Sequence, residues 1–379
     1  MNSVEILERL VAFRTVSRNP NLDLIHWVRD FLASRGIEAR LYPDDTGNKA
    51  NLFASIGPVE RGGILLSGHT DVVPVDGQRW STDPFSLFER DGQLFGRGSA
   101  DMKGFLACAL RAADLASKCT LRTPLHLAFS HDEEIGCIGV RSLIEDMAKW
   151  AHKPQLCIVG EPTMLRTALG HKGKSAYTVT CNGRATHSAN PARGINAIHL
   201  ACDLIHTLRQ QQELLAASDH FDSAYEVPYT TVHVGTIDGG TVCNIVPARC
   251  ELEFEIRNLP DESAATIAAS IREAAEELCK RYDDKDARID LAVTNQYPAL
   301  DTPADSPIVA LLTALTGNAS TFKVGFGSEA GLFSGELGIP TAVCGPGSID
   351  QAHKPDEFIS RDQLERCDAM MDALLQRLL

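Results

Sequence analysis

The chain has 379 residues, of which 44% are hydrophobic and 23% charged, and its formal net charge is −14 at pH 7. This length and composition predict an ordinary globular protein of two domains. The acidic balance argues against nucleic acid or an anionic membrane as the main partner, and no apolar run approaches the roughly 18 residues of a membrane span.

The eleven cysteines are scattered along the chain, and none forms a Cys-x-x-Cys pair. An odd set without framework spacing is typical of reduced thiols in the cytoplasm. The first residues lack a basic segment followed by an unbroken apolar one, so we expect no signal peptide and a cytoplasmic location.

Apolar positions recur at helical spacing near the start of the chain, and short apolar runs of strand length follow them. Continuous apolar runs indicate strands that are covered on both faces, and their alternation with helices indicates an α/β fold with a mainly parallel sheet. We expect helices at 4–16, 22–35 and 105–117, and strands at 51–56, 62–67, 125–130, 156–160 and 341–345.

The middle of the chain has a different pattern, in which some strands alternate between apolar and polar residues. The expected strands are 175–183, 230–237, 248–257 and 288–295, and the expected helices are 195–211 and 263–282. This βαββαβ order is ferredoxin-like. We therefore predict a ferredoxin-like domain over 175–291, inserted into an α/β domain formed by 1–174 and 292–379.

Residue types that bind metals follow four of the five expected strands of the α/β domain, those at 62–67, 125–130, 156–160 and 341–345. The carboxyl ends of parallel strands share one sheet edge, where ligands bind. Two imidazoles with several carboxylates suit zinc or a similar ion, and their number fits a pair of ions about 3.5–4 Å apart better than one tetrahedral ion. The residues concerned are His69, Asp71, Asp101, the acidic run Asp132, Glu133 and Glu134, and then Glu161 and His353.

A structural role is the alternative for each of these residues taken singly. Acidic residues after strands can cap helices, and Asp101 precedes the helix expected at 105–117. His131 flanks the acidic run, and a structural role is favoured for it. For the whole set, spread over several strand ends at one predicted edge, the metal interpretation is favoured.

Five motifs in order carry a resemblance to a known family. They are "GHTDVVPVDGQRWSTDPF", "GRGSADMKG", "SHDEEIGCIG", "IVGEPT" and "AHKPDEF". Together they resemble the M20 metallopeptidases, the superfamily of dinuclear zinc aminoacylases and carboxypeptidases. Within it they are most similar to the acetylornithine deacetylases, and the likeness runs over nearly the whole chain.

The resemblance implies a role for each matching residue. His69 and Glu161 would hold one ion, Glu134 and His353 the other, and Asp101 would bridge them; the ions would be Zn²⁺, with Co²⁺ as an alternative. Asp71 would orient His69. Glu133 would act as general base and then as general acid. His131 stands where the family more often has another residue.

The resemblance also implies a homodimer, in which the inserted domain serves as a dimerisation or lid domain. His187 would reach the active site of the partner subunit and stabilise the oxyanion, while Asn244 and Arg257 would bind the substrate. For Arg257 a surface salt bridge is an equal alternative.

The implied reaction is hydrolysis of a small N-acyl amino acid, namely removal of the acetyl group from N2-acetyl-L-ornithine in arginine biosynthesis. One alternative is a sister activity: succinyl-diaminopimelate desuccinylase, another N-acyl-amino-acid deacylase, or a dipeptidase. The other is an inactive binding protein that retains the metals. The presence of Glu133 and all five ligand positions argues against it.

Overall fold

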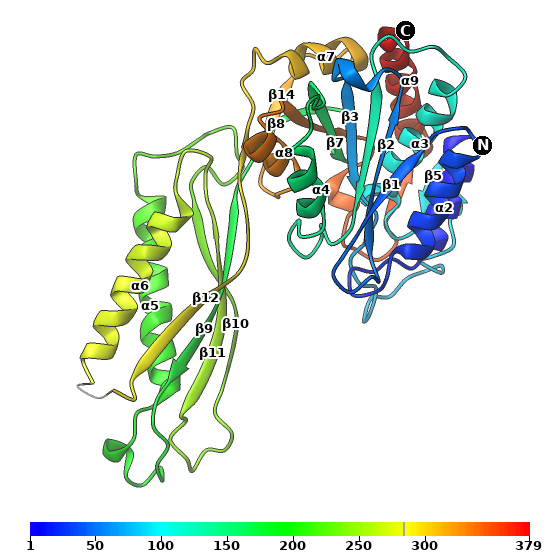
Figure 1. Cartoon of the computed structure of the whole chain (residues 1–379). Helices are drawn as coiled ribbons and strands as arrows, with labels where there is room; N and C mark the ends of the chain where they lie inside the picture. The colour runs from blue at the N-terminus through cyan, green and yellow to red at the C-terminus, as the bar shows by residue number, and fades with distance from the viewer. Residues whose placement is uncertain (283–284) are drawn as a thin grey trace. The chain divides into compact units, whose positions relative to one another are not determined.

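The structure, a computed structural model of the chain, describes residues 1–282 and 285–379. These residues form two compact units, which are drawn in Figure 1. The larger unit comprises Met1–Gly170, Leu300–Lys323 and Ser328–Leu379, and the smaller comprises His171–Ala299 and Val324–Gly327. The smaller unit therefore interrupts the larger one in sequence.

A mixed sheet forms the centre of the larger unit, with strand order β1-β2-β6-β3-β7-β15-β8-β13 and β14 paired to β8. The interior strands β6, β3, β7 and β15 are parallel neighbours, whereas β1 with β2, β2 with β6, and β8 with β15 pair antiparallel. The strands are β1 (Ala39–Pro43), β2 (Ala50–Ile56), β3 (Ile64–His69), β6 (Leu125–Ser130), β7 (Leu156–Pro162), β8 (Thr167–His171), β13 (Leu300–Asp301), β14 (Thr321–Val324) and β15 (Thr341–Gly345).

Helices cover both faces of this sheet, as Figure 1 shows. One face packs in a common hydrophobic core with α1 (Ser3–Ala12), α2 (Leu22–Ala33), α3 (Gly104–Ala116), α7 (Pro307–Thr316) and α9 (Arg361–Leu378). The other face contacts α4 (Val140–Met147) and α8 (Ala330–Leu337). Every residue of β3 and β6 is buried, which explains their continuous apolar sequence.

The first helix is shorter than predicted. The helix expected over 4–16 ends at Ala12, and the chain then runs extended toward β3. Val16 forms a bridge with Val72, and the Thr15 hydroxyl donates to the carbonyl of Thr70 at 2.6 Å. These long-range contacts override the helical spacing and bring Ser17 close to Asp71.

A small antiparallel sheet in the larger unit joins two segments that are distant in sequence. Its strands are β4 (Phe88–Arg90), β5 (Gln93–Phe95) and β16 (Phe358–Ser360), in the order β16-β5-β4. Phe95 pairs with Phe358, so the loop that follows β5 lies beside the segment that precedes β16. The loop continues into the irregular helical turn Ser99–Lys103 before α3.

The smaller unit has the predicted βαββαβ order. Its antiparallel sheet runs β10-β11-β9-β12, and its two helices pack on one face of the sheet in a separate core. Burial alternates along β9 and β11, and β12 is an outer strand with mostly exposed residues. The elements are β9 (Lys174–Asn182), α5 (Ala197–Ala216), β10 (Thr231–Gly239), β11 (Arg249–Arg257), α6 (Ala264–Lys280) and β12 (Arg288–Tyr297).

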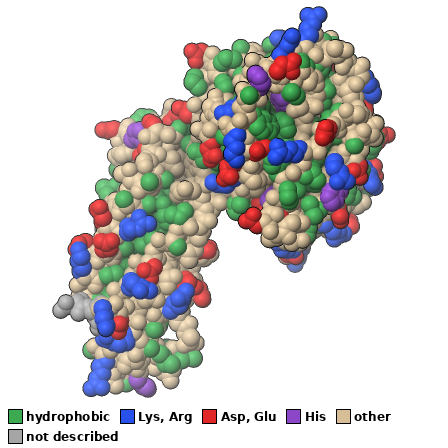
Figure 2. Space-filling model, viewed as in Figure 1, with side chains coloured by type: hydrophobic (Ala, Val, Ile, Leu, Met, Phe, Trp, Pro, Cys, Tyr) green, Lys and Arg blue, Asp and Glu red, His purple; other side chains and the backbone are tan. Residues whose placement is uncertain are grey.

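The predicted fold class, an α/β unit with an inserted ferredoxin-like unit, is thus confirmed; the sheet of the α/β unit is parallel in its interior and antiparallel toward its edges. None of the helices in the described ranges is both long and apolar enough to cross a membrane. Lysine and arginine side chains are interspersed with acidic ones on the face of the molecule in Figure 2.

Candidate metal centre

The parallel strands place the predicted ligands at one edge of the larger unit's sheet. His69 is the last residue of β3 and lies opposite Ser130, the last residue of β6. Glu161 is the next-to-last residue of β7, and His353 follows β15 by eight positions. These side chains are far apart in sequence, from His69 to His353. They converge because parallel strands end on the same side of the sheet.

Asp101 lies between the two imidazoles. Its Oδ1 is 3.1 Å from Nε2 of His69, and its Oδ2 is 3.4 Å from Nε2 of His353. His69 Nε2 is also 3.7 Å from Oε1 of Glu161, and His353 Nε2 is 3.0 Å from Oε2 of Glu134. The five side chains thus form two histidine–glutamate pairs with one aspartate between them.

Glu133 and Glu134 lie in a turn beyond the end of β6. The turn closes through hydrogen bonds from the amides of Gly136 and Cys137 to the carbonyl of Glu133, at 2.7 and 2.8 Å. Because neighbours on a regular strand point to opposite faces, the turn is what allows both carboxylates to serve one site.

Asp71 holds this turn. Its Oδ1 accepts the amide of Glu133 at 3.2 Å, and its Oδ2 accepts the amide of Glu134 at 3.3 Å and the Ser17 hydroxyl at 2.7 Å. Toward His69, the carbonyl of Asp71 is 2.9 Å from Nδ1 and its carboxylate 3.6 Å. Asp71 therefore contacts His69 most closely through its backbone, and its carboxylate mainly supports the two glutamates.

Asp132 anchors the other side of the turn. It has a positive φ of 57°, which is costly for a residue with a side chain. Lys49 Nζ donates to Asp132 Oδ1 at 2.6 Å, and His131 Nδ1 lies 3.1 Å from Asp132 Oδ2. Burial opposes ionisation, but the proximity of His131 and the hydrogen bond from Lys49 lower the pKa of Asp132. His131 is thus buried beside the turn, in a supporting position.

Burial and mutual repulsion disfavour the ionised form of the carboxylates in this cluster. Burial raises the pKa of Glu133 well above its ordinary value, and repulsion from Glu134 adds to this. Burial and repulsion from Asp101 likewise raise the pKa of Glu161, and they raise that of Glu134 to about 7. Conversely, hydrogen bonds to Asp101 and Glu134 raise the pKa of His353 to about 10. Bound divalent cations would stabilise the ionised form of these carboxylates and the neutral form of the imidazoles.

The donor set fits a metal centre. One ligand atom each from His69, Asp101 and Glu134 lie within 4.8 Å of one another, and so do atoms from His69, Glu133 and Glu161. Imidazole nitrogens combined with carboxylate oxygens suit Zn²⁺ and related divalent ions. Since Glu133 belongs to one of these groups, its position is compatible with two roles, that of a metal ligand and that of a general base.

Several buried residues at the site were not selected from the sequence. Glu357 and Arg97 support the loop that carries Asp101, and Lys49 supports the turn. Glu329, at the start of α8, is also buried, and its Oε2 accepts from the Ser67 hydroxyl at 3.4 Å. Burial raises the pKa of Glu329 to about 7. Two of these buried residues lie in motifs of the family resemblance: Glu357 in "AHKPDEF", four residues after His353, and Arg97 in "GRGSADMKG".

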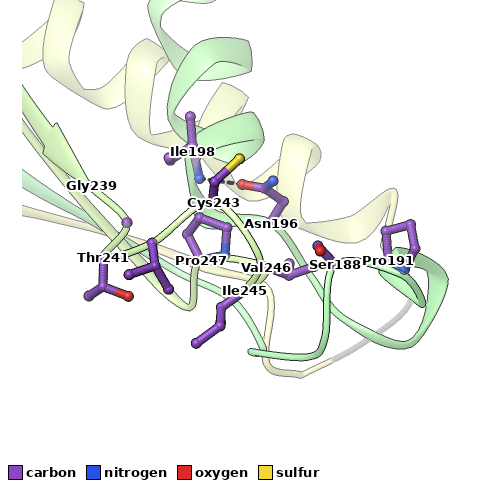
Figure 3. Close-up of a pocket in the computed structure, with 12 residues that line it drawn as sticks. Ser188, Pro191, Asn196, Ile198, Gly239, Thr241, Cys243, Ile245, Val246 and Pro247 are labelled. Atoms are coloured by element: carbon purple, nitrogen blue, oxygen red, sulfur yellow. Dashed lines mark hydrogen bonds between the residues drawn. The ribbon is translucent and has the colours of Figure 1, made fainter.

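His187 and Asn244 lie in the smaller unit, on two neighbouring loops. His187 forms a bridge with Ile245, and the amide of Ser188 donates to the carbonyl of Asn244 at 3.0 Å. The loops border a depression of about 530 Å³, shown in Figure 3, whose lining includes the exposed Ile245. His187 Nδ1 accepts the amide of Ala189 at 3.1 Å, so the neutral ring carries its proton on Nε2.

Arg257 ends β11 and is half-buried within the smaller unit. Its Nε donates to Oε1 of Glu255 at 2.8 Å, and its Nη1 donates to the hydroxyl of Tyr297 at 3.2 Å. The structure thus contains a salt bridge at this position, which is the structural alternative considered for Arg257.

Comparisons with known proteins agree with this geometry. The sequence matches the model of Peptidase family M20/M25/M40 over residues 65–377. Acetylornithine deacetylase from Klebsiella pneumoniae (strain 342) is 37% identical over 366 residues, which cover 94% of this chain and 92% of that protein.

Two solved structures share the fold. The M20 family metallo-carboxypeptidase Sso-CP2 from Sulfolobus solfataricus has a TM-score of 0.79 at 19% identity, and the match covers 99% of each chain. The Bacillus subtilis protein YXEP, described as a dinuclear metal binding peptidase from the M20 family, has a TM-score of 0.68 at 16% identity. That match covers 99% of this chain and 97% of the other.

Proposed function

The chain belongs to the M20/M25/M40 peptidase family, and from this premise we propose that it is a dinuclear metal enzyme that removes the acetyl group from N2-acetyl-L-ornithine. The observation that carries the proposal is the placement of Asp101 between the pairs His69–Glu161 and His353–Glu134. The 37% identity to an acetylornithine deacetylase over 94% of the chain supports the substrate.

In this proposal His69 and Glu161 would hold one ion, Glu134 and His353 would hold the other, and Asp101 would be a ligand shared by both. Two divalent ions, most simply Zn²⁺ and alternatively Co²⁺, would supply Lewis acidity to the amide carbonyl and to the attacking water when bound. Asp71 and Lys49 keep the turn 132–134 in place, so that both glutamates keep their orientation.

Glu133 is the proposed proton carrier. It accepts the proton of the attacking water and delivers it to the leaving nitrogen, so acetate and L-ornithine are released and the carboxylate is regenerated. Its half-buried position, with a pKa raised by burial, suits a group that must both take up and release a proton.

His187 is the proposed oxyanion donor, acting on the active site of the partner subunit in a homodimer. The proton on Nε2, implied by the hydrogen bond at Nδ1, gives the ring a donor for developing negative charge. Asn244 on the neighbouring loop and Arg257 are proposed to bind the substrate. The exposed strand β12 is a suitable edge for pairing between subunits.

A substrate panel tests this proposal. The zinc-loaded protein is assayed for acetate release from N2-acetyl-L-ornithine, for succinate release from N-succinyl-diaminopimelate, and for dipeptide hydrolysis. We expect the highest kcat/KM for acetylornithine. A higher value for either of the other substrates would reassign the chain to a sister activity, and no zinc-dependent hydrolysis of any of them would remove the proposal.

A further inference from the structure

A buried carboxylate outside the ligand set binds the loop that carries Asp101. Both oxygens of Glu357 are used: Oε1 accepts the amides of Ala100 and Asp101 at 2.9 and 3.1 Å, and Oε2 accepts the amide of Gly98 at 2.9 Å. Glu357 is only 1% exposed, so water does not compete for these bonds. One side chain therefore fixes three amides of a four-residue loop.

Arg97 completes the arrangement from the other end of the loop. Its Nη1 lies 2.7 Å from Oε2 of Glu357, and both side chains are 1% exposed. The same Nη1 donates to the carbonyl of Lys354 at 3.3 Å. The pair thus connects the loop of Asp101 to the segment that contains His353.

Gln78 extends the connection to His353 itself. Nη2 of Arg97 donates to Oε1 of Gln78 at 2.6 Å, and Nε2 of Gln78 donates to the carbonyl of His353 at 3.0 Å. His353 has a positive φ of 61°, a conformation that a residue with a side chain adopts only when its surroundings hold it there. The contacts from Gln78 and Arg97 supply such surroundings.

We infer that Glu357, together with Arg97, is a positioning residue that fixes Asp101 and His353 relative to each other so that two divalent ions can bind. The inference rests on the proposed dinuclear function. A carboxylate suits this role because it can accept from several amides and the guanidinium at once, whereas a neutral amide has only one acceptor oxygen. Outer residues that orient metal ligands affect metal affinity strongly.

The test is the variant Glu357→Gln, with Zn²⁺ affinity measured by competition against a chromophoric chelator. We expect Zn²⁺ binding to weaken by about 10- to 100-fold, as for other residues that orient ligands. The matched control is Asp114→Asn, which breaks the largely buried pair of Arg35 with Asp114, 2.5 Å apart, elsewhere in the larger unit. It should lower the melting temperature of the metal-free protein while leaving Zn²⁺ affinity unchanged.

A second variant separates positioning from the burial of an unpaired charge. Arg97→Met with Glu357→Leu removes both charges, so no lone buried ion remains. We expect this double variant to fold. We also expect it to bind Zn²⁺ more weakly than the wild-type protein, as Glu357→Gln does. Wild-type affinity in either Glu357 variant, with only the melting temperature lowered, would overturn the inference. Failure of the wild-type protein itself to bind two ions would instead overturn the proposed function.

Discussion

At the scale of single residues, the two adjacent glutamates Glu133 and Glu134 have different surroundings, and we propose different roles for them. Glu134 lies 3.0 Å from His353, whereas Glu133 accepts from the thiol of Cys137 at 3.3 Å. We expect Glu133→Gln to keep both metal ions while kcat falls by about 10²- to 10⁴-fold, the usual effect of removing a general base. Glu134→Gln should lose metal. Metal content and kcat, measured for both variants, check this.

Equal metal loss in the two variants would contradict this division of roles. It would make Glu133 a ligand, which its place in a group with His69 and Glu161 also allows. Full activity in Glu133→Gln would exclude the residue as proton carrier altogether.

The seven residues proposed for the metal centre could be selected from the sequence because each follows a strand or a glycine-rich turn. Chain order then places them at one edge of a parallel sheet. Glu357 and Lys49 could not be selected in this way. Their partners, Asp101 and Asp132, are 256 and 83 positions away, and only the folded chain brings them together.

At the scale of elements, the turn after β6 is held by Lys49, the residue immediately before β2. Lys49 Nζ contacts both the carboxylate of Asp132 and the carbonyl of Ser17. We expect Lys49→Met to lower the free energy of unfolding by about 1–3 kcal/mol, because it leaves a largely buried carboxylate without its cation. It should also lower kcat, since the turn carries Glu133.

The matched control for Lys49→Met is Arg14→Met, which removes the exposed pair of Arg14 with Asp83. Exposed pairs contribute little, so urea unfolding and kcat should match the wild type. An unchanged kcat in Lys49→Met would show that the turn keeps its shape without this contact.

Apolar periodicity predicted most elements well, because strands that are covered on both faces have unbroken apolar sequences. It placed the end of the first helix wrongly. Residues 13–16 keep a helical pattern, but Thr15 and Val16 bond to the segment after β3. That competition between local propensity and tertiary contact is not encoded in a short window of sequence.

At the scale of the whole molecule, the proposed role of His187 requires two subunits for each active site. The variants Glu133→Gln and His187→Ala should each have little or no activity alone. Mixing the two variant proteins so that they exchange subunits should restore activity. Half of randomly mixed dimers would be heterodimers with one complete site, so about a quarter of wild-type activity is expected. No recovery, in a mixture shown to exchange subunits, would place His187 in its own subunit's site or outside catalysis.

We propose that this chain hydrolyses acetylornithine only when two divalent ions occupy the cluster around Asp101. The most direct test is to strip the protein with a chelator, add Zn²⁺ stepwise, and follow acetate release from N2-acetyl-L-ornithine. We expect negligible release from the stripped protein and full activity after two equivalents have bound. Undiminished release from the stripped protein, or none after two equivalents have bound, would contradict it.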